Sequence, residues 1–482
     1  MTSNTAIPAA GDLHFDVHGY FRAPFRVGSN SRPSPSGPNQ SATIFHEPLL
    51  LDDQYLNWSY TRAQEKSLAE LYFSFGNSLI VANLAVVANN FDDWERLSNA
   101  QLGVSQGWLT VSPNIGRPDV RIAWRVGAFE SRYGMAGRDD AGPYDTYLIG
   151  RTHQMGELLT AELDVAGGDV TLKAEHGIGA HGEEPVSPVN VTPVIANALT
   201  VLHHAHLGAS FFKRVEVNLH YMNAFTMDSR GSEPEGSLRV LGADAKANGA
   251  FGYLYFGVAS LHLSNALHVG PAIETVHSFG PNPFWLDFIG NLLGPGSQGN
   301  GTVNTLEGSY EYSFAPLWRK LVTPGAGLDG EGADARLGLF GMYSTVSSDV
   351  PACDGLHKLK FGGDLAADVL SWLAIGMRFD RVLPKVDDGS IAFSTFSPRV
   401  VFRGSGWASR ENVSFVYSHY AYGSALRNSP IANDANHPGL GLPRSYGSSL
   451  AGSGAFAETG GTGPIDRPPD SDVIAVKATM WW

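Results

Sequence analysis

The chain is poor in several kinds of residue, and each shortage excludes a class of protein. Only one of its 482 residues, Cys353, is a cysteine, which excludes an intramolecular disulfide framework and a cysteine-based metal cluster. Charged residues make up 17%, below the quarter that is usual for a soluble protein. The net charge of −14 argues against binding to nucleic acid, because phosphate contacts need a basic face.

Long apolar segments are also missing. The best run, residues 79–88, falls well short of the roughly 20 residues that a membrane-spanning helix needs. A strand that crosses a bilayer at a tilt needs only about 9–11 residues, so a membrane β-barrel remains possible. The N-terminus lacks the basic and apolar regions of a signal peptide. For an exported barrel we therefore expect that a signal peptide has already been removed.

The motifs of several enzyme classes are absent as well. The chain has no Gly-x-Ser-x-Gly elbow, no P-loop and no His-Glu-x-x-His sequence. His203, His204 and His206 suggest a metal site, but no third ligand accompanies the pair that shares a strand face. We expect no catalytic residue, no metal, no cofactor and no enzymatic activity.

What the chain does have is alternation of apolar and polar residues. In the last ten residues every second position is apolar, from Ile474 to Met480, and the chain ends on Trp481 and Trp482. Residues 13–27 alternate over a longer stretch, with Phe15, Val17 and Phe21 among the apolar positions. A period of two over so many residues indicates a tilted membrane strand rather than a typical globular strand of about 5–6 residues.

Similar segments recur along the chain and give eighteen candidate strands. They lie at roughly 13–27, 66–77, 78–91, 101–112, 119–133, 153–165, 168–178, 200–212, 215–228, 236–248, 249–263, 302–314, 335–347, 356–368, 371–383, 391–404, 411–423 and 471–482. Segments 249–263 and 335–347 alternate poorly, so sixteen strands remain an alternative. An even number is what a bacterial barrel requires.

Short and long connections alternate between these segments. Short turns are typical of the periplasmic end of an outer-membrane barrel and long loops of its outer end. The connection at 315–334 departs from this rule because it is long on the short-turn side. We predict a transmembrane antiparallel β-barrel over 13–482 with a tail at 1–12, in a Gram-negative outer membrane. A soluble all-β lectin or sandwich is the alternative fold.

Several motifs resemble those of the maltoporin-type sugar porins. The stretch from Phe15 to Arg22 contains His-Gly-Tyr-Phe-Arg and is similar to their first strand. Ala69-Glu70-Leu71, a loop around Trp94, a Trp-Arg-Val-Gly-Ala-Phe stretch at 124–129 and the Trp-Trp ending follow in the family's order. The resemblance covers about the first 180 residues and the last strand. It implies an eighteen-stranded barrel that assembles as a homotrimer in outer-membrane lipid.

The resemblance also implies a sugar path through the barrel. In that family an aromatic ladder binds sugar rings weakly at successive points. Tyr20, Trp94 and Trp481 would form this ladder, whereas Trp482 would anchor the chain at the membrane interface. Loop 134–152 would fold inward and narrow the channel. The polar and constriction residues would be His18, Arg22, Arg132, Asp145 and Tyr147.

We therefore expect passive diffusion of maltodextrin-like sugars through a water-filled channel. Two other functions fit the sequence. A non-specific diffusion porin would pass ions and small solutes through a charged constriction without an aromatic ladder. A barrel used mainly as a surface adhesin or receptor would depend on its long loops, such as 28–65 and 424–470.

Overall fold

The computed structural model describes fourteen stretches of the chain. They are residues 13–29, 68–89, 101–135, 147–181, 198–228, 236–264, 300–314, 334–349, 354–355, 357–383, 385–389, 392–406, 409–423 and 471–481. The expected tail at 1–12 lies outside these residues.

Eighteen β-strands make up nearly all of the described chain. They are β1 (His14–Ser29), β2 (Leu68–Gly76), β3 (Ile80–Asn89), β4 (Gln101–Val111), β5 (Val120–Met135), β6 (Tyr147–Val165), β7 (Val170–His181), β8 (Ala198–Phe211), β9 (Val215–Asp228), β10 (Ser237–Gly249), β11 (Gly252–Ser264), β12 (Gly301–Ser313), β13 (Asp334–Ser348), β14 (His357–Leu370), β15 (Leu373–Leu383), β16 (Phe393–Gly406), β17 (Ser409–Tyr422) and β18 (Ser471–Trp481).

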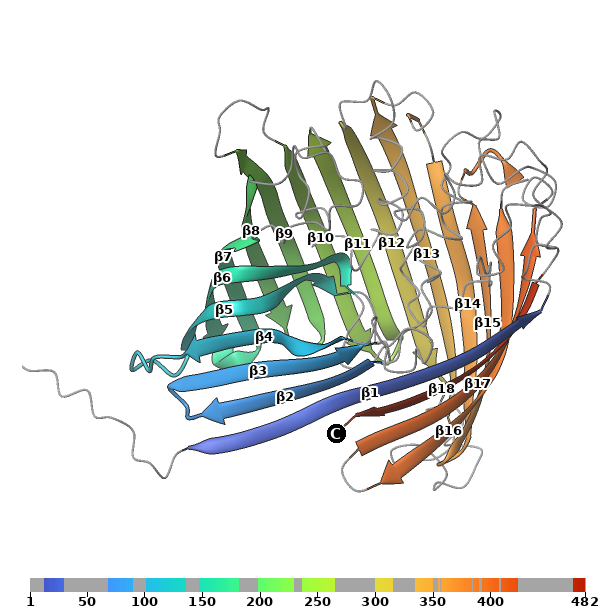
Figure 1. Ribbon diagram of the computed structural model, residues 1–482, viewed down its shortest axis with the longest axis horizontal. Helices are drawn as coiled ribbons and strands as arrows, with labels where there is room; N and C mark the ends of the chain where they lie inside the picture. Colours follow the sequence, from blue (N-terminus) through green and yellow to red (C-terminus); the bar gives the residue numbers. More distant parts are fainter. Residues whose placement is uncertain are drawn as a thin grey trace, which may run out of the picture.

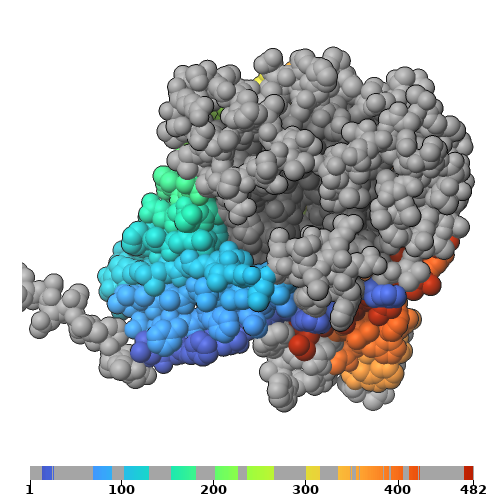
Figure 2. All heavy atoms as spheres, in the orientation of Figure 1, coloured from blue at the N-terminus to red at the C-terminus, as the bar shows by residue number. Residues whose placement is uncertain are grey.

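Each strand pairs antiparallel with its neighbours in sequence, and β1 pairs with β18, so that the sheet closes on itself. At the seam Tyr20 lies opposite Trp481. The first strands, in blue, lie directly beside the last ones, in red, in both views (Figures 1 and 2). Strands β1–β7 cross β9–β14 steeply in Figure 1, as the two walls of a tilted barrel do. Closure gives every strand a paired neighbour on both sides, which a barrel in lipid requires.

The eighteen expected strands are confirmed, and most bounds agree within about two residues. The poorly alternating segments at 249–263 and 335–347 form β11 and β13. On β11 the inward positions Tyr253, Tyr255 and Leu261 are themselves apolar, which removes the contrast between the two faces. The alternative of sixteen strands is therefore wrong.

The main difference in bounds concerns the loop expected at 134–152. Strand β5 runs to Met135 and β6 begins at Tyr147, because cross-strand pairing continues from Arg132 opposite Arg151 to Met135 opposite Tyr147. The connection between these strands is thus confined to residues 136–146. The long connection on the short-turn side is real, since β12 ends at Ser313 and β13 begins at Asp334.

Pro24 does not end the first strand. It lies inside β1, opposite Lys477 of β18, and the pairing continues to Ser29. On the other side of β1, β2 begins at Leu68, which lies opposite Arg22. Beyond Arg22 that edge of β1 has no paired strand among the described residues, so a proline there need not interrupt a ladder on that side.

The outer surface is a belt of apolar side chains. Phe15 and Phe25 on β1 are 63% and 65% exposed, Leu102 on β4 is 79% exposed, and Leu241 on β10 is 60% exposed. Large apolar residues in such number would aggregate in water but match a hydrocarbon environment. The described residues contain no helix with the length and apolar character needed to cross a bilayer.

Candidate functional site: the inner wall of the barrel

Alternation along each strand divides the residues between lipid and lumen. On β9, Val215, Val217 and Leu219 are 40–54% exposed, whereas Asn218 and His220, on the other face, are 6% and 5% exposed. The exposed apolar set belongs to the outer belt, so the polar set lines the inside. The inner wall is the surface that any solute in the lumen would meet, and we treat it as the candidate site.

Three ion-paired steps follow the inner wall on β13–β16, and we call them the ion-pair ladder. Nearest the short-turn end, Asp368 accepts hydrogen bonds from Arg403 at 2.6 Å and from Arg336 at 3.4 Å. In the middle, Asp364 binds both terminal nitrogens of Arg399 at 2.7 and 2.8 Å. The third step is on β15. There Arg378 holds Asp380 through two bonds of 2.9 and 2.8 Å.

The steps of the ladder differ in how much of each side chain remains open. Side-chain exposure is 34% for Arg336, 22% for Arg399 and 16% for Arg403, but only 3% for Arg378. The first three can therefore still contact water or a passing solute while they are paired. Arg378 also lies over the ring of Phe340, with its guanidinium carbon 5.1 Å from the ring centroid.

A second polar network covers the inner wall of β7–β10. Glu175 pairs with Lys173 at 2.9 Å and with His206 at 2.8 Å. The His206 ring continues to Asn218 at 3.0 Å, and Asn218 donates to Asp244 at 2.8 Å. These polar groups satisfy one another, which is the condition for placing them on a wall with restricted access to water.

The histidines considered as metal ligands belong to this wall only in part. His204 and His206 share one strand face, as predicted, and it is the inner face; His204 contacts the side-chain oxygen of Gln154 at 3.1 Å. Its ring fits there because residue 177 is a glycine, where a Cβ would lie 2.1 Å from the His204 ring. His203 faces outward with Leu207. Among the described residues no three His, Cys, Asp or Glu side chains are grouped as metal ligands.

Aromatic residues gather where the barrel closes, on β1 and β2. His18 lies opposite Tyr72, with nearly parallel rings and centroids 5.1 Å apart. Tyr20 lies opposite Glu70 on one side and Trp481 on the other. We call His18, Tyr20, Glu70 and Tyr72 the closure strip. Tyr20 is only 2% exposed, whereas the His18 side chain is 52% exposed, so His18 is open to the lumen and Tyr20 is buried.

The structure places the sequence-predicted site residues unequally. His18, Tyr20 and Arg22 share the inner face of β1, and the register aligns the position of Trp481 with Tyr20. Arg132 lies in β5 and Tyr147 in β6, near the loop ends of these strands. The other three predicted residues, Trp94, Asp145 and Trp482, lie outside the described residues.

Sequence reasoning missed Tyr72 and the whole ion-pair ladder. A usable signal was present, since Asp364 and Asp368 are four residues apart on one strand and Arg399 and Arg403 are four apart on another. A spacing of four keeps each pair on one face of its strand. Nothing in the sequence, however, gives the register that brings β14 and β16 into contact across β15.

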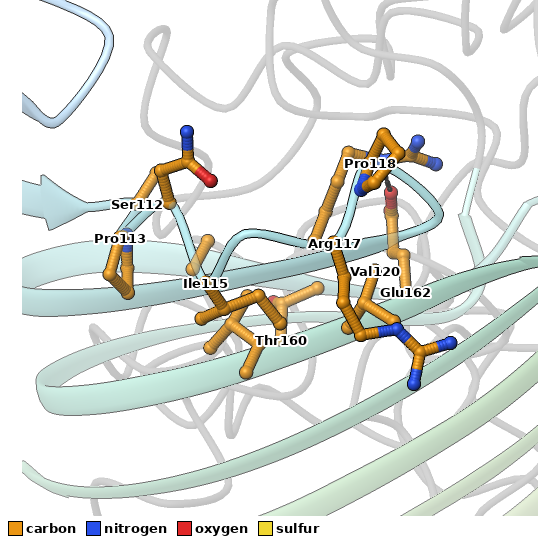
Figure 3. A pocket seen from close by; sticks show the side chains of 12 residues that line it. Ser112, Pro113, Ile115, Arg117, Pro118, Val120, Thr160 and Glu162 are labelled. Carbon is orange, nitrogen blue, oxygen red and sulfur yellow. Dashed lines mark hydrogen bonds and ion pairs between the residues drawn. The ribbon is translucent and has the colours of Figure 1, made fainter.

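A cavity of about 380 Å3 lies at the short-turn end, between the turn 112–119 and the wall formed by β5 and β6. Figure 3 shows Ile115 and Arg117 of the turn lying over Thr160 of β6. Arg117 donates to Asp119 at 2.6 Å, and this hydrogen bond lowers the pKa of Asp119 below its ordinary value. The charged lining residues are paired, so the free surface of the cavity is mainly apolar.

No protein-family model matches the chain, and no curated protein matches it in sequence. Among solved structures it is similar to OmpT, an outer-membrane protein of Vibrio cholerae, with 9% identity, 99% of this chain and 100% of that chain covered, and a TM-score of 0.40. It is also similar to OpdL of Pseudomonas aeruginosa, with 8% identity, 98% of each chain covered and a TM-score of 0.41. A third similar structure is the outer-membrane channel DcaP of Acinetobacter baumannii, with 8% identity, 99% of each chain covered and a TM-score of 0.38.

At TM-scores of this size nothing about solute or assembly is transferred to this chain. Its own geometry decides the class: eighteen antiparallel strands close into one barrel, the outer belt is apolar, and the inner wall is polar and charged. The protein is a transmembrane β-barrel of the Gram-negative outer-membrane type.

Proposed function

We propose that the protein is a passive channel through which small hydrophilic solutes diffuse across the outer membrane. The observation that carries this proposal is the ion-pair ladder, because three of its four arginines keep part of their surface open although they are paired. A barrel that served only as a scaffold for its loops would not need partly exposed ion pairs along its length. Weak contacts at successive positions suit passage, since a solute must enter and also leave.

We further propose that sugars of the maltodextrin type are among these solutes. The closure strip supports this view, because the stacked rings of His18 and Tyr72 offer apolar faces on which a sugar ring can lie, and the exposed carboxylate of Asp16 offers acceptors for hydroxyl groups beside them. Ladder roles for Trp94 and Trp481, the constriction roles of Arg132, Asp145 and Tyr147, and the homotrimer extend the family resemblance and remain part of the proposal.

The test is the block of ion current by maltohexaose in planar bilayers. We expect a saturable block, and we expect Tyr72→Ala to weaken it about tenfold, as the loss of roughly 1–1.5 kcal/mol of ring contact would do. Phe73→Ala is the matched control, because Phe73 is the next residue on β2 but faces outward and stacks on Phe15. Equal block in both variants would contradict a sugar contact at the closure strip.

A non-specific diffusion porin is the second candidate, and the charged ladder favours it. Such a channel would show ion selectivity set by the ladder but a current that does not respond to millimolar sugar. The same recording distinguishes these channels from a surface adhesin or receptor, because a barrel with only that function would give no ion current when correctly folded.

A further inference from the structure

One sector of the outer face carries polar groups inside the apolar belt. Glu157 on β6, His203 on β8, Asn223 on β9 and Arg239 on β10 follow one another along a single register row, with Ile178 of β7 between the first two. Their neighbours on the same face are exposed apolar residues of the belt, such as Met155, Leu207, Leu219 and Leu241 at 54–66% exposure. These four side chains therefore point away from the lumen.

Glu157, His203 and Asn223 lie within the belt, and Arg239, ten residues from Gly249 at the short-turn end of β10, lies at its outer edge. Glu157, His203 and Asn223 are each eight residues from the short-turn end of their strands, at Val165, Phe211 and Val215. With a rise of about 3.3 Å per residue and a tilt near 40°, that is a height of about 20 Å in a belt about 25 Å tall. Hydrocarbon offers such groups no hydrogen bonds, so the sector is poorly matched to lipid.

The polar groups of the sector are only partly satisfied within the chain. His176 and His203 bring their Nε2 atoms to 2.8 Å, and the ring of Tyr221 meets the His203 ring edge-on at 5.8 Å. The indole nitrogen of Trp124 donates to Glu157 at 3.0 Å. The side-chain oxygen of Asn223 is buried and accepts no hydrogen bond.

Small residues also lie on this face, among bulky ones such as Leu207 and Leu219. Outward positions between β7 and β10 include Ala174, Ala205, Ala209, Ala243 and Ala245. Across the barrel, the outward positions of β15–β17 are mostly bulky, among them Ile375, Phe379, Phe396, Phe402 and Phe415 at 40–47% exposure. Small side chains let another backbone approach closely, whereas bulky apolar ones suit contact with acyl chains.

We propose that the outward face of β6–β10 is the surface by which this chain contacts a second copy of itself. The row carries an acid, Glu157, at one end and a base, Arg239, at the other, so two copies can pair opposite charges. A lipid phosphate would be attracted by Arg239 but repelled by Glu157. Five strands about 4.8 Å apart and a belt about 25 Å tall give roughly 600 Å2 per copy, close to the roughly 800 Å2 of a standard interface.

Distances between spin labels on different copies test the proposal in the full-length protein. Cys353 is replaced by Ser, and one nitroxide label is attached at Ala205→Cys within the proposed face. The control label is at Val400→Cys, an outward position on β16, eight strands away. An eighteen-stranded barrel is about 35 Å across, so the two positions differ widely in their distance from a contact at β6–β10. Dilution with unlabelled chain shows that any coupling arises between copies.

We expect a shorter label-to-label distance at position 205 than at position 400, and a smaller oligomeric fraction when Glu157 and His203 are both replaced by Leu. A heat-dependent gel shift shows whether that variant still folds, and the label comparison remains decisive if it does not. The proposal is wrong if the protein is a monomer, with or without bound lipopolysaccharide, and the spin labels show no coupling between copies at either position. A shorter distance at position 400 also contradicts it. Neither result depends on which solute the channel passes.

Discussion

At the scale of single residues, the barrel's interior depends on charges that are paired yet still accessible. Asp364 is buried and holds Arg399 through two hydrogen bonds, and the arginine side chain keeps 22% of its surface open. Such an arrangement fixes the direction of the guanidinium group while its outer edge remains available to solutes. The balance of charge along the ladder should therefore set which ions pass.

Asp364 and Arg399 should have opposite effects on ion selectivity, so removing the charge of one should shift it in the opposite direction from removing the charge of the other. Asp364→Asn leaves the positive charge of Arg399 without its carboxylate, so we expect the reversal potential in a salt gradient to move toward anion selectivity. Arg399→Gln should move it toward cations. Each single variant should also cost about 1–3 kcal/mol of stability, because a buried partner is left unpaired.

The double variant Asp364→Asn with Arg399→Gln is the control for this prediction. It removes both charges, so the reversal potential should return close to the wild-type value. If both single variants shift selectivity in the same direction, a general change of channel shape is responsible and the electrostatic explanation is wrong.

The inward set on the first strand could be predicted residue by residue. Period two over residues 13–27 placed His18, Tyr20 and Arg22 on one face, and the structure agrees. The alternation could not show how deeply each side chain is buried. Tyr20 is almost fully buried, whereas the His18 ring is open and stacks on Tyr72, from a different strand. Cross-strand contacts depend on register, which a single strand's pattern does not contain.

At the scale of elements, the turns are as informative as the strands. The turn between β8 and β9 has two central residues, Phe212 and Lys213, with φ of 52° and 55°. Positive φ at both positions is the backbone of a type I′ hairpin turn, for which Asn and Gly are the usual residues. The sequence Phe-Lys-Arg predicted a short turn there but gave no sign of this conformation.

Replacement of Lys213 by Gly should stabilise this hairpin. A non-glycine residue at positive φ is strained, and glycine relieves the strain but adds freedom to the unfolded chain, so the net gain should be about 0.5–1 kcal/mol. Guanidinium unfolding of the folded barrel in detergent micelles measures it. Lys213→Ala removes the same side chain but retains a Cβ, so it should give no such gain. Equal effects of the two substitutions would assign the change to the lost charge instead.

The turn between β4 and β5 should respond to pH through one pair. Arg117 lowers the pKa of Asp119 from 3.8, so the pair contributes stability above the ordinary carboxyl pKa and loses it as the pH falls through the lowered value. We expect Arg117→Gln to return the pKa of Asp119 toward 3.8. The carboxyl 13C chemical shift of labelled aspartate, recorded as a function of pH, measures this pKa. An unchanged titration would show that Arg117 does not hold the carboxylate.

Strand positions were predictable because the barrel imposes the same alternation on almost every strand. The exceptions have a physical cause. On β11 the inner wall is itself apolar, with Leu261 and Leu263 fully buried, so inner and outer positions look alike in the sequence. Likewise, the continued pairing of β5 with β6 beyond residue 133 depends on contacts between strands rather than on the alternation within either one.

At the scale of the whole molecule, closure is what turns eighteen amphipathic strands into a membrane protein. The pairing of β1 with β18 satisfies the last two strand edges, and only then can every backbone group avoid exposure to lipid. The alternation of short and long connections predicted which end faces the periplasm. The register at the seam, with Tyr20 opposite Trp481, could not be read from either terminal segment alone.

We infer that the polar inner wall lines a water-filled passage through the outer membrane. The most direct test is the ion current of the purified, folded barrel after insertion into a planar lipid bilayer. We predict stepwise increases in current, one for each insertion, that vary linearly with voltage near zero. If protein whose gel shift shows it to be folded is inserted and the bilayer current stays at its lipid-only level, the inner wall lines no open passage.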